Sequence, residues 1–511
     1  MPPLLSPIFL ALATATLAQT QATQPRDIST LPTLLQSISA TVFPPLKAIA
    51  VSIWSNPELG LSEHHAHDLI VDHFTTQLAD PSLWTVTPHA FGLPTAFKLE
   101  SSFRPPAVPP TAAIPTIGFL AEYDALVGIG HACGHNHIAL NGLAAASMTR
   151  AALTSLGIAA RVVVIGTPDE ENMAGKHTLL QAGAFDGIDV WFEAHPTSAN
   201  AVQPMNARVN AIASFASASH TQTVRTAYEA LVAVRDLTTS GLPGTSSSAV
   251  PVEEVGMFEC NVVQGQISLG INGSSVAAVQ ATVSGILDST YPGVTFTVAQ
   301  DTIEGGVNLT AFGPVPLVLT IETFRALSAQ PGVSFFLPGN TTHTELDIIW
   351  DIRSRYTQDL NTVLNAVTAI VDDKTTSITT DTIYPALEVT PFLPGVLIDL
   401  LKTAPYGSQT DWAVSTFAPA STDASWLQGA VVDPTTKALV GADRVVFHPN
   451  FNICQAGEPC AFNHEPPFRD VAGTDFSYTR TEVIARSLAH IAVELLNDPA
   501  MMANATAILG S

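Results

Sequence analysis

Residues 115–124 read Pro115-Thr116-Ile117-Gly118-Phe119-Leu120-Ala121-Glu122-Tyr123-Asp124, an apolar run that ends in acids. Two further apolar runs, 161–166 and 188–192, are followed by Asp169-Glu170-Glu171 and by Glu193-Ala194-His195. Helical patterns at 139–156 and 176–183 lie between the runs. Apolar strands that alternate with helices predict an α/β fold with a buried, largely parallel sheet flanked by helices. Because the carboxyl ends of parallel strands share one edge, the polar motifs are expected to meet there.

The most informative polar segment is 130–136, Gly-His-Ala-Cys-Gly-His-Asn, which follows the first apolar run. It places the thiol of Cys133 and the imidazole of His135 two residues apart, and the carboxylate pair Glu170-Glu171 comes later. Such ligands are typical of metal-dependent hydrolases, in which one acid binds metal and its neighbour moves protons. The alternatives for Cys133 are a structural buried thiol and a cysteine nucleophile.

The composition limits the classes of partner. The 511 residues exceed what one core usually supports, so two domains are expected. The net charge of −24 argues against nucleic acid and anionic membrane surfaces as partners. Residues 1–18 resemble a signal peptide, which predicts a secreted protein, and no later stretch is long and apolar enough for a membrane helix. Four N-x-S/T sequons fit a secreted glycoprotein, and they start at Asn272, Asn308, Asn340 and Asn504.

The chain has four cysteines: Cys133, Cys260, Cys454 and Cys460. In an oxidising compartment we expect Cys454 and Cys460 to close a small disulfide loop, and the alternative is two unrelated thiols.

The middle of the chain differs in character from both ends. After residues 27–205, the block 206–384 is rich in Ser, Thr, Val and Gly, and it predicts a smaller α+β domain inserted into the first. The α/β pattern returns over 385–511. Near the N-terminus, 29–51 and 63–78 predict helices. The histidines at 64, 65 and 67 are interpreted as a solvated helix face, because no other ligand type completes a metal site there.

Several short segments resemble one known family when taken in order. They are Asn56-Pro57-Glu58-Leu59-Gly60 with Glu63, Gly92-Leu93-Pro94-Thr95-Ala96, residues 121–126 and 130–136, Gly166-Thr167-Pro168 before Glu170-Glu171, Ser421-Thr422-Asp423, Phe447-His448-Pro449 and Asn463-His464. The set is similar to the two-metal peptidases and amidohydrolases that include aminoacylases, carboxypeptidase G and the indole-acetyl-amino-acid hydrolases. The resemblance implies a zinc-peptidase-like catalytic domain with an inserted lid domain, and a chain that is a monomer or a homodimer.

The resemblance also implies roles for individual residues. It makes Cys133, His135, Glu171, His195 and His464 the ligands of two divalent metal ions, zinc first, with manganese or cobalt as alternatives. Glu170 becomes the general base, and Asp124 orients a ligand histidine. His448 is either a packed histidine near the site or a substrate contact, and His131 is interpreted as structural.

Three lid residues complete the implied site. His220 resembles an oxyanion stabiliser, and Asn340 with Arg353 resembles the pair that binds a substrate carboxylate. A salt bridge at the end of a strand is the alternative for Arg353. The stretch between His220 and this pair is longer than in the family, which predicts an insertion.

These observations predict a secreted metal-dependent amidohydrolase that cleaves N-acyl amino acids or small dipeptides. One rival is a cysteine amidohydrolase that uses Cys133 with His135. The other is a catalytically weak protein that binds peptides or conjugates, against which the intact Glu170-Glu171 pair counts.

Overall fold

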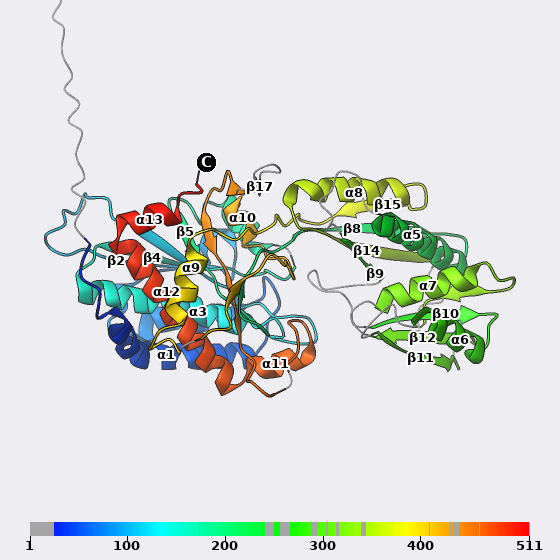
Figure 1. Ribbon diagram of the computed structural model, residues 1–511, viewed down its shortest axis with the longest axis horizontal. Helices are drawn as coiled ribbons and strands as arrows, with labels where there is room; N and C mark the ends of the chain where they lie inside the picture. Colours follow the sequence, from blue (N-terminus) through cyan, green and yellow to red (C-terminus); the bar gives the residue numbers. More distant parts are fainter. Residues whose placement is uncertain are drawn as a thin grey trace, which may run out of the picture.

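The computed structural model describes residues 25–172, 174–240, 250–255, 266–287, 294–302, 305–312, 316–338, 344–407, 409–429, 431–432, 439–458 and 460–509. They form two lobes: a larger one built from both ends of the chain, and a smaller one from the middle block, called the lid below (Figure 1). The expected signal peptide at 1–18 lies outside the described residues, as do Cys260 and Asn340.

A six-stranded sheet forms the centre of the larger lobe, in the order β1-β2-β4-β3-β5-β19. Its strands are β1 (Thr85–Pro88), β2 (Phe97–Phe103), β3 (Thr116–Ala121), β4 (Ala160–Gly166), β5 (Val190–Phe192) and β19 (Val445–Phe447). The last four run parallel to one another, and β1 and β2 form an antiparallel edge. The predicted α/β fold with a largely parallel sheet is therefore confirmed, and the three apolar runs of the sequence form β3, β4 and β5.

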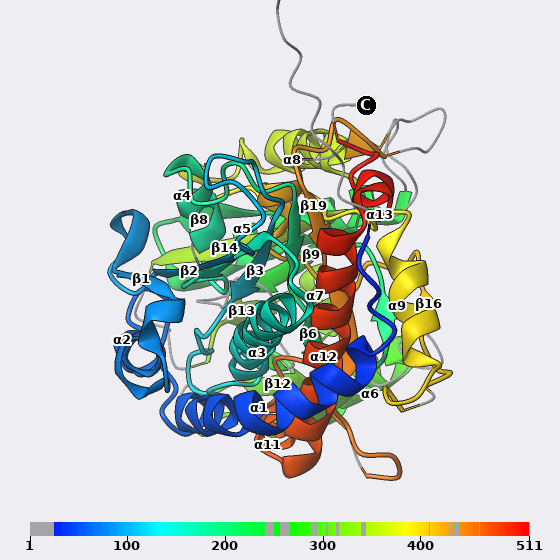
Figure 2. The same cartoon turned by 90° about the vertical axis from the view of Figure 1, so that its left-hand side faces the viewer.

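Helices cover both faces of this sheet. On one face lie α1 (Leu31–Ser55), α3 (His135–Leu156) and α12 (Asp475–Asn497), which are grouped in Figure 2. The other face carries α4 (Gly175–Gln181) and α10 (Ser425–Gln428). Within β4, Val162 and Val164 belong to the first core, whereas Val163 and Ile165 belong to the second. This alternation follows from the two-residue period of a strand, and it explains why the run is apolar throughout.

A small four-stranded sheet adjoins the central one, in the order β16-β7-β20-β6. It consists of β6 (His195–Thr197), β7 (Ala201–Val202), β16 (Ala413–Val414) and β20 (Pro449–Asn452). The remaining elements of the larger lobe are α2 (His64–Asp72) with a π-helical turn (His73–Gln77), two short 3₁₀ turns (Pro81–Leu83 and Ala90–Gly92), the hairpin of β17 (Val431–Val432) and β18 (Leu439–Val440), α9 (Leu393–Leu401), α11 (Pro466–Ala472) and α13 (Pro499–Ala505).

Two expectations for the N-terminal helices are wrong. Helix α1 continues through Pro44 and Pro45 to Ser55, and by length and composition it could cross a membrane, so a stretch that meets these criteria does exist. In the structure α1 packs against α3 and α12. His67 is buried instead of solvated: its Nδ1 lies 2.8 Å from an Asp68 carboxylate oxygen and its ring stacks on His89.

The lid contains a unit of the β-α-β-β-α-β type that connects directly to the larger lobe. Its elements are β8 (Ala207–Ala216), α5 (His220–Ser240), β9 (Val250–Val255), β14 (Glu345–Ser354), α8 (Thr357–Val371) and β15 (Ser377–Thr380). The strands form an antiparallel sheet in the order β15-β8-β14-β9. Counted along the unit this order is 4-1-3-2, which is a ferredoxin-like arrangement.

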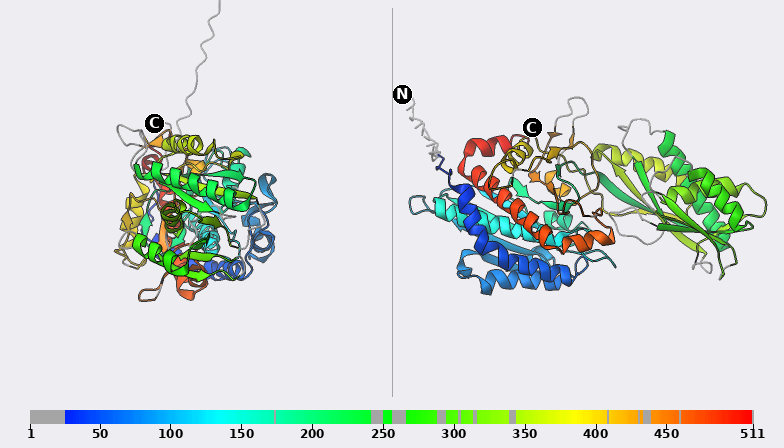
Figure 3. Two further views of the ribbon diagram at one scale, coloured as in Figure 1. Left: turned by 90° about the vertical axis from the view of Figure 1, so that its right-hand side faces the viewer. Right: turned by 60° about the horizontal axis from the view of Figure 1, so that its bottom comes forward.

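The insertion between β9 and β14 repeats this arrangement. It consists of β10 (Gln266–Asn272), α6 (Val276–Leu287), β11 (Thr295–Gln300), β12 (Val307–Phe312), α7 (Pro316–Ser328) and β13 (Ser334–Phe336). Its strands pair in the order β11-β12-β10-β13, and every pairing is antiparallel. Both units contribute to one hydrophobic core, and they lie side by side in the right panel of Figure 3. The extra length predicted for the middle block is thus a second unit with the same alternation of strands and helices, nested in the first.

Candidate metal centre

Residues 130–136 form the turn that leads from the end of β3 into α3. The helix begins at His135, four residues before the predicted start, so this side chain belongs to the first helical turn. Gly134 has φ +85°, and a Cβ there would lie 2.6 Å from Cγ of Pro196. A glycine between Cys133 and His135 is required for both reasons.

Three overlapping groups of side chains could hold metal ions at this edge of the sheet. The groups are Cys133, His135 and His195; Cys133, Glu171 and His464; and His135, Glu170 and Glu171. Within each group, one ligand atom per residue lies within 4.8 Å of the others. The fold therefore brings together all five residues predicted as ligands, although they come from separate segments of the chain.

Asp124 orients two members of these groups. One of its oxygens lies 2.9 Å from Nδ1 of His135, and the other accepts the backbone N–H of Glu171 at 3.0 Å. This hydrogen-bond pattern assigns the proton of His135 to Nδ1 and leaves a lone pair on Nε2. That Nε2 is buried without a hydrogen bond among the described residues, 3.4 Å from Glu122 Oε2 and 3.5 Å from Glu171 Oε1. A buried lone pair among acids has the chemistry of a cation ligand.

His195 and His464 both favour the neutral form that ligates metals. Nδ1 of His195 donates to the carbonyl of Pro196 at 2.8 Å, and its Nε2 lies 3.5 Å from Sγ of Cys133. Burial, followed by the neighbouring imidazoles of His448 and His135, lowers the pKa of His195 well below its usual value. Burial and the charge of His135 lower the pKa of His464 to about 3. Neutral imidazoles, a thiol and carboxylates fit divalent ions such as zinc.

The turn before the acid pair is held by Glu63. One of its carboxylate oxygens accepts the backbone N–H of Asp169 at 2.9 Å, and the other accepts the hydroxyl of Thr95 at 2.7 Å. Asp169 has φ +65°, an unfavourable conformation for a non-glycine residue that these contacts maintain. Burial, followed by the charge of Asp124, raises the pKa of Glu63 to about 8. Two of the sequence fragments that carry the family resemblance, around residues 60 and 95, therefore support the position of Glu170 and Glu171.

Glu170 is held by two residues from much later in the chain. Its backbone carbonyl accepts the hydroxyl of Tyr384 at 2.8 Å, and its Oε1 accepts the backbone N–H of Asp423 at 3.3 Å. Burial, followed by the negative charge of Glu171, raises the pKa of Glu170 well above its usual value. A carboxyl group with a raised pKa is suited to accept and return a proton near neutral pH.

The sequence reasoning missed a buried ion network behind the candidate ligands. Lys176, fully buried in α4, contacts carboxylate oxygens of Glu122, of Asp423 at 2.5 Å and of Glu193 at 3.5 Å. His448 joins the network through Nε2, 3.4 Å from Glu193. The acids follow apolar runs and are visible in the sequence, but a single lysine at the start of a helix gives no pattern from which its burial could be predicted.

Replacement of Lys176 by methionine is expected to lower the free energy of unfolding by about 3–5 kcal/mol, because it leaves buried carboxylates without their cation. Chemical denaturation of the variant and the parent measures this difference. Lys402→Met serves as the control, since Lys402 is half exposed and pairs with the exposed Asp399, so its loss is expected to change stability by about 0.5 kcal/mol or less. Equal stabilities of the two variants would contradict the central place given to Lys176.

The predicted lid residues lie at different distances from this centre. Arg353 binds Asp351 at 2.7 Å, as in the salt-bridge alternative, yet its charge also contributes to the lowered pKa of His464, so it lies within electrostatic range of the ligands. His220 begins α5, where its Nε2 accepts the backbone N–H of Leu337 inside the lid at 3.1 Å. His448 is buried, with its ring 5.8 Å from that of His195.

The fold and the site define a class of protein: an α/β domain with a candidate metal centre at the carboxyl ends of its parallel strands. The family model described as peptidase family M20/M25/M40 matches residues 118–452. The chain belongs to this family of hydrolases, which act on peptide bonds.

Comparisons with individual proteins agree with this assignment. The chain is 49% identical to the Xaa-Arg dipeptidase of Homo sapiens over 162 residues, which are 30% of this chain and 36% of that protein. It is 30% identical to a p-aminobenzoyl-glutamate hydrolase chain of Escherichia coli (strain K12) over 165 residues, 29% of this chain and 31% of the relative. The matches thus span about a third of each relative.

The fold also matches a solved structure. A proposed aminohydrolase from methicillin resistant Staphylococcus aureus is similar over 91% of this chain and 99% of its own, with a TM-score of 0.52 and 15% identity.

Proposed function

We propose that this chain is a secreted metal-dependent amidohydrolase that cleaves the amide bond of N-acyl amino acids or small dipeptides. Membership of the peptidase family supports the reaction class. The similarity to a protein named Xaa-Arg dipeptidase and to one named p-aminobenzoyl-glutamate hydrolase supports a small substrate with an amide bond to an amino acid.

One observation carries the proposal: the two groups Cys133, His135, His195 and Cys133, Glu171, His464 overlap at Cys133, with Glu170 beside them. This arrangement suits two divalent ions, zinc first and manganese or cobalt as alternatives. Hydrolysis of a panel tests it, with Xaa-Arg dipeptides, p-aminobenzoyl-glutamate and N-acyl amino acids as substrates and release of the free amino acid as the readout. Binding without turnover across the panel would favour the rival of a binding protein.

When bound, such ions polarise the substrate carbonyl and lower the pKa of water to about 7. The residues of this chain supply the remaining parts. Glu170 accepts the proton of the attacking water and gives it to the leaving amine. Asp124 keeps the proton of His135 on Nδ1, so that Nε2 remains available as a ligand. Lys176 and Asp423 hold Glu170 in place through the backbone N–H of Asp423.

The lid contributes the recognition of the substrate in this proposal. Arg353 binds the substrate carboxylate through its guanidinium fork, together with Asn340, and His220 stabilises the oxyanion once the lid closes over the metal centre. In the present structure His220 points into the lid, so this role requires it to exchange its contact with Leu337 for the substrate. The division of the chain at 205/206 and 384/385, and a monomeric or homodimeric state, remain predictions.

Replacement of Arg353 by lysine is expected to raise KM for substrates with a free carboxylate by about 10–100-fold, with a smaller change in kcat, because lysine lacks the bidentate fork. Steady-state kinetics on one dipeptide and on its C-terminal amide measure the effect. The amide is expected to bind both enzymes equally poorly. Arg325→Lys is the matched control, because Arg325 lies on the lid surface and pairs with Asp236. An unchanged KM for the free acid would remove Arg353 from the substrate site.

A further inference from the structure

The segment that carries His464 needs external support to hold its shape. His464 has φ +69°, a left-handed conformation that is unfavourable for a residue other than glycine. Its side chain is 6% exposed, and its Nε2 lies 3.4 Å from Oε1 of Glu171. A ligand in a strained loop keeps its position only if surrounding contacts over-determine the conformation.

Asn463 supplies two of these contacts. Its side-chain Nδ2 donates to the backbone carbonyl of Cys133 at 3.0 Å and to that of Pro196 at 2.9 Å. Cys133 is itself a candidate ligand, and Pro196 directly follows the candidate ligand His195. The amide of Asn463 therefore joins the three segments that carry Cys133, His195 and His464. The backbone N–H of His464 adds a third bond, to the carbonyl of Ala132 at 2.9 Å.

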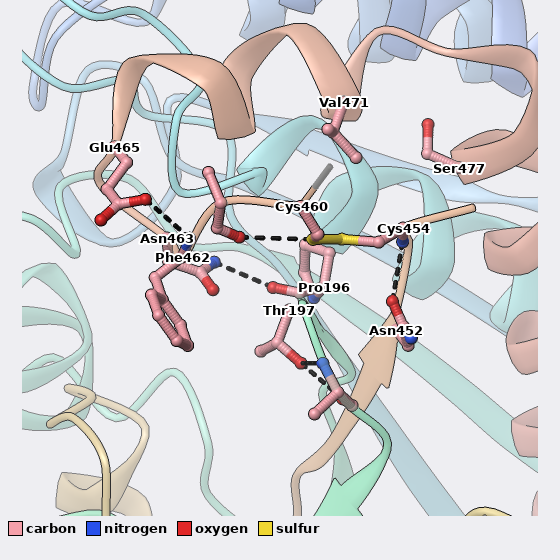
Figure 4. Close-up of a disulfide and its surroundings, with 12 residues drawn as sticks. Pro196, Thr197, Asn452, Cys454, Cys460, Phe462, Asn463, Glu465, Val471 and Ser477 are labelled. Atoms are coloured by element: carbon pink, nitrogen blue, oxygen red, sulfur yellow. Dashed lines mark hydrogen bonds between the residues drawn. A yellow bond between two sulfur atoms is a disulfide. The ribbon is translucent and has the colours of Figure 1, made fainter. Parts of the chain in front are cut away.

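A disulfide closes the same loop from the other side. Cys454 and Cys460 are joined, as predicted from the sequence, with their Cα atoms 5.8 Å apart. Figure 4 shows this bond beside Pro196, Asn463 and Asn452. Cys454 follows β20, and its backbone N–H donates to the side chain of Asn452 at 2.7 Å.

Strand β20 ties this anchor to a second ligand. It pairs in parallel with β6, and Asn450 stands opposite His195 in the register. The backbone N–H of Ile453 continues the connection to the carbonyl of Thr197 at 3.0 Å. The disulfide thus attaches the chain just before His464 to the strand that lies beside the one carrying His195.

We propose that Asn463 is a positioning residue for the metal ligand His464, and that the Cys454–Cys460 disulfide restrains the same loop, so that retention of one metal ion depends on both. The inference rests on the proposed function, because it takes His464 as a ligand. The ion concerned is the one held by Cys133, Glu171 and His464. The ion at Cys133, His135 and His195 depends less on this loop, because only Cys133 is shared.

The test measures zinc bound per chain at a series of buffered free zinc concentrations. The proteins are the purified parent, Asn463→Ala and the double variant Cys454→Ser/Cys460→Ser. In each variant one of two zinc equivalents is expected to bind about 10–100-fold more weakly, and the other to shift less, as is typical when the support of a metal ligand is removed. The Tm gained on adding zinc is expected to shrink in the same variants.

Asn497→Ala is the matched control. The side chain of Asn497 also makes two hydrogen bonds to backbone, both to Arg26, at a place remote in sequence from every candidate ligand. This control separates loss of metal from loss of stability: its zinc binding is expected to equal that of the parent, whatever its zinc-free Tm. Because the two loop changes are made separately, failure of one variant to fold leaves the other to decide.

The outcomes distinguish this inference from the proposed function. If the parent binds two zinc ions and both loop variants bind them equally well, the inference is wrong and the metal-dependent hydrolase stands. A parent that binds no zinc overturns both. Weaker binding at one site in the loop variants, with no change in Asn497→Ala, supports the positioning role.

Discussion

Replacement of Glu170 by glutamine is expected to lower kcat by about 10²–10⁴-fold with little change in KM, because the amide cannot accept a proton from the attacking water. The change keeps the size of the side chain and leaves an oxygen for the backbone N–H of Asp423. Steady-state kinetics on the substrate with the highest turnover in the panel measure the effect.

Two further variants give this experiment its meaning. Glu171→Gln is expected to lose metal as well as activity, whereas Glu170→Gln keeps the metal content of the parent, because only Glu171 is assigned as a ligand. Glu229→Gln is the surface control, since Glu229 is about half exposed and pairs with Arg225 on α5, and its activity is expected to be unchanged. A Glu170→Gln enzyme that retains full kcat would show that another group moves the proton.

Removal of the metal is expected to have the second large effect. Dialysis against a chelator should lower kcat/KM by about 10³-fold or more, since a bound ion supplies several kcal/mol of stabilisation to the transition state, and each factor of ten corresponds to about 1.4 kcal/mol. Addition of zinc or manganese should restore the activity, and metal analysis before and after dialysis should follow it. Activity that is indifferent to the chelator would point to another mechanism.

The same preparations decide between a metal ligand and a nucleophile at Cys133. Its side chain is 6% exposed, and burial, followed by the charge of Glu171, raises the pKa of the thiol well above its usual value. Without a metal this thiol stays protonated and is a poor nucleophile. Iodoacetamide is therefore expected to leave the metal-loaded enzyme active. Rapid inactivation of that form, together with indifference to chelation, would favour the cysteine amidohydrolase.

The sequence already contained the larger lobe. The runs that form β3, β4 and β5 are short and apolar, and the helical patterns stand between them, so their order required a parallel sheet. The chemistry at the strand ends followed from the same order, because parallel strands bring their carboxyl ends to one edge. The helix limits were less accurate: α3 starts at His135 because Gly134 allows the turn, which the apolar pattern from 139 onward did not reveal.

The lid shows where a local pattern is insufficient. Its length predicted an insertion, but the nesting of one β-α-β-β-α-β unit in another depends on which strands pair, and those pairings join segments far apart in the sequence. The place of His220 was likewise decided by a contact with Leu337, more than a hundred residues away.

By itself the sequence determined the reaction class and the candidate ligands, because metal chemistry restricts the residue types and the sheet restricts where they stand. Only the tertiary structure decided how these residues are supported. The burial of Lys176 among three acids, and the hydrogen bonds of Asn463 to two distant carbonyls, join segments that have no relation in sequence. Such contacts form because buried charges and strained loops need partners, and those partners are defined by position in space instead of order along the chain.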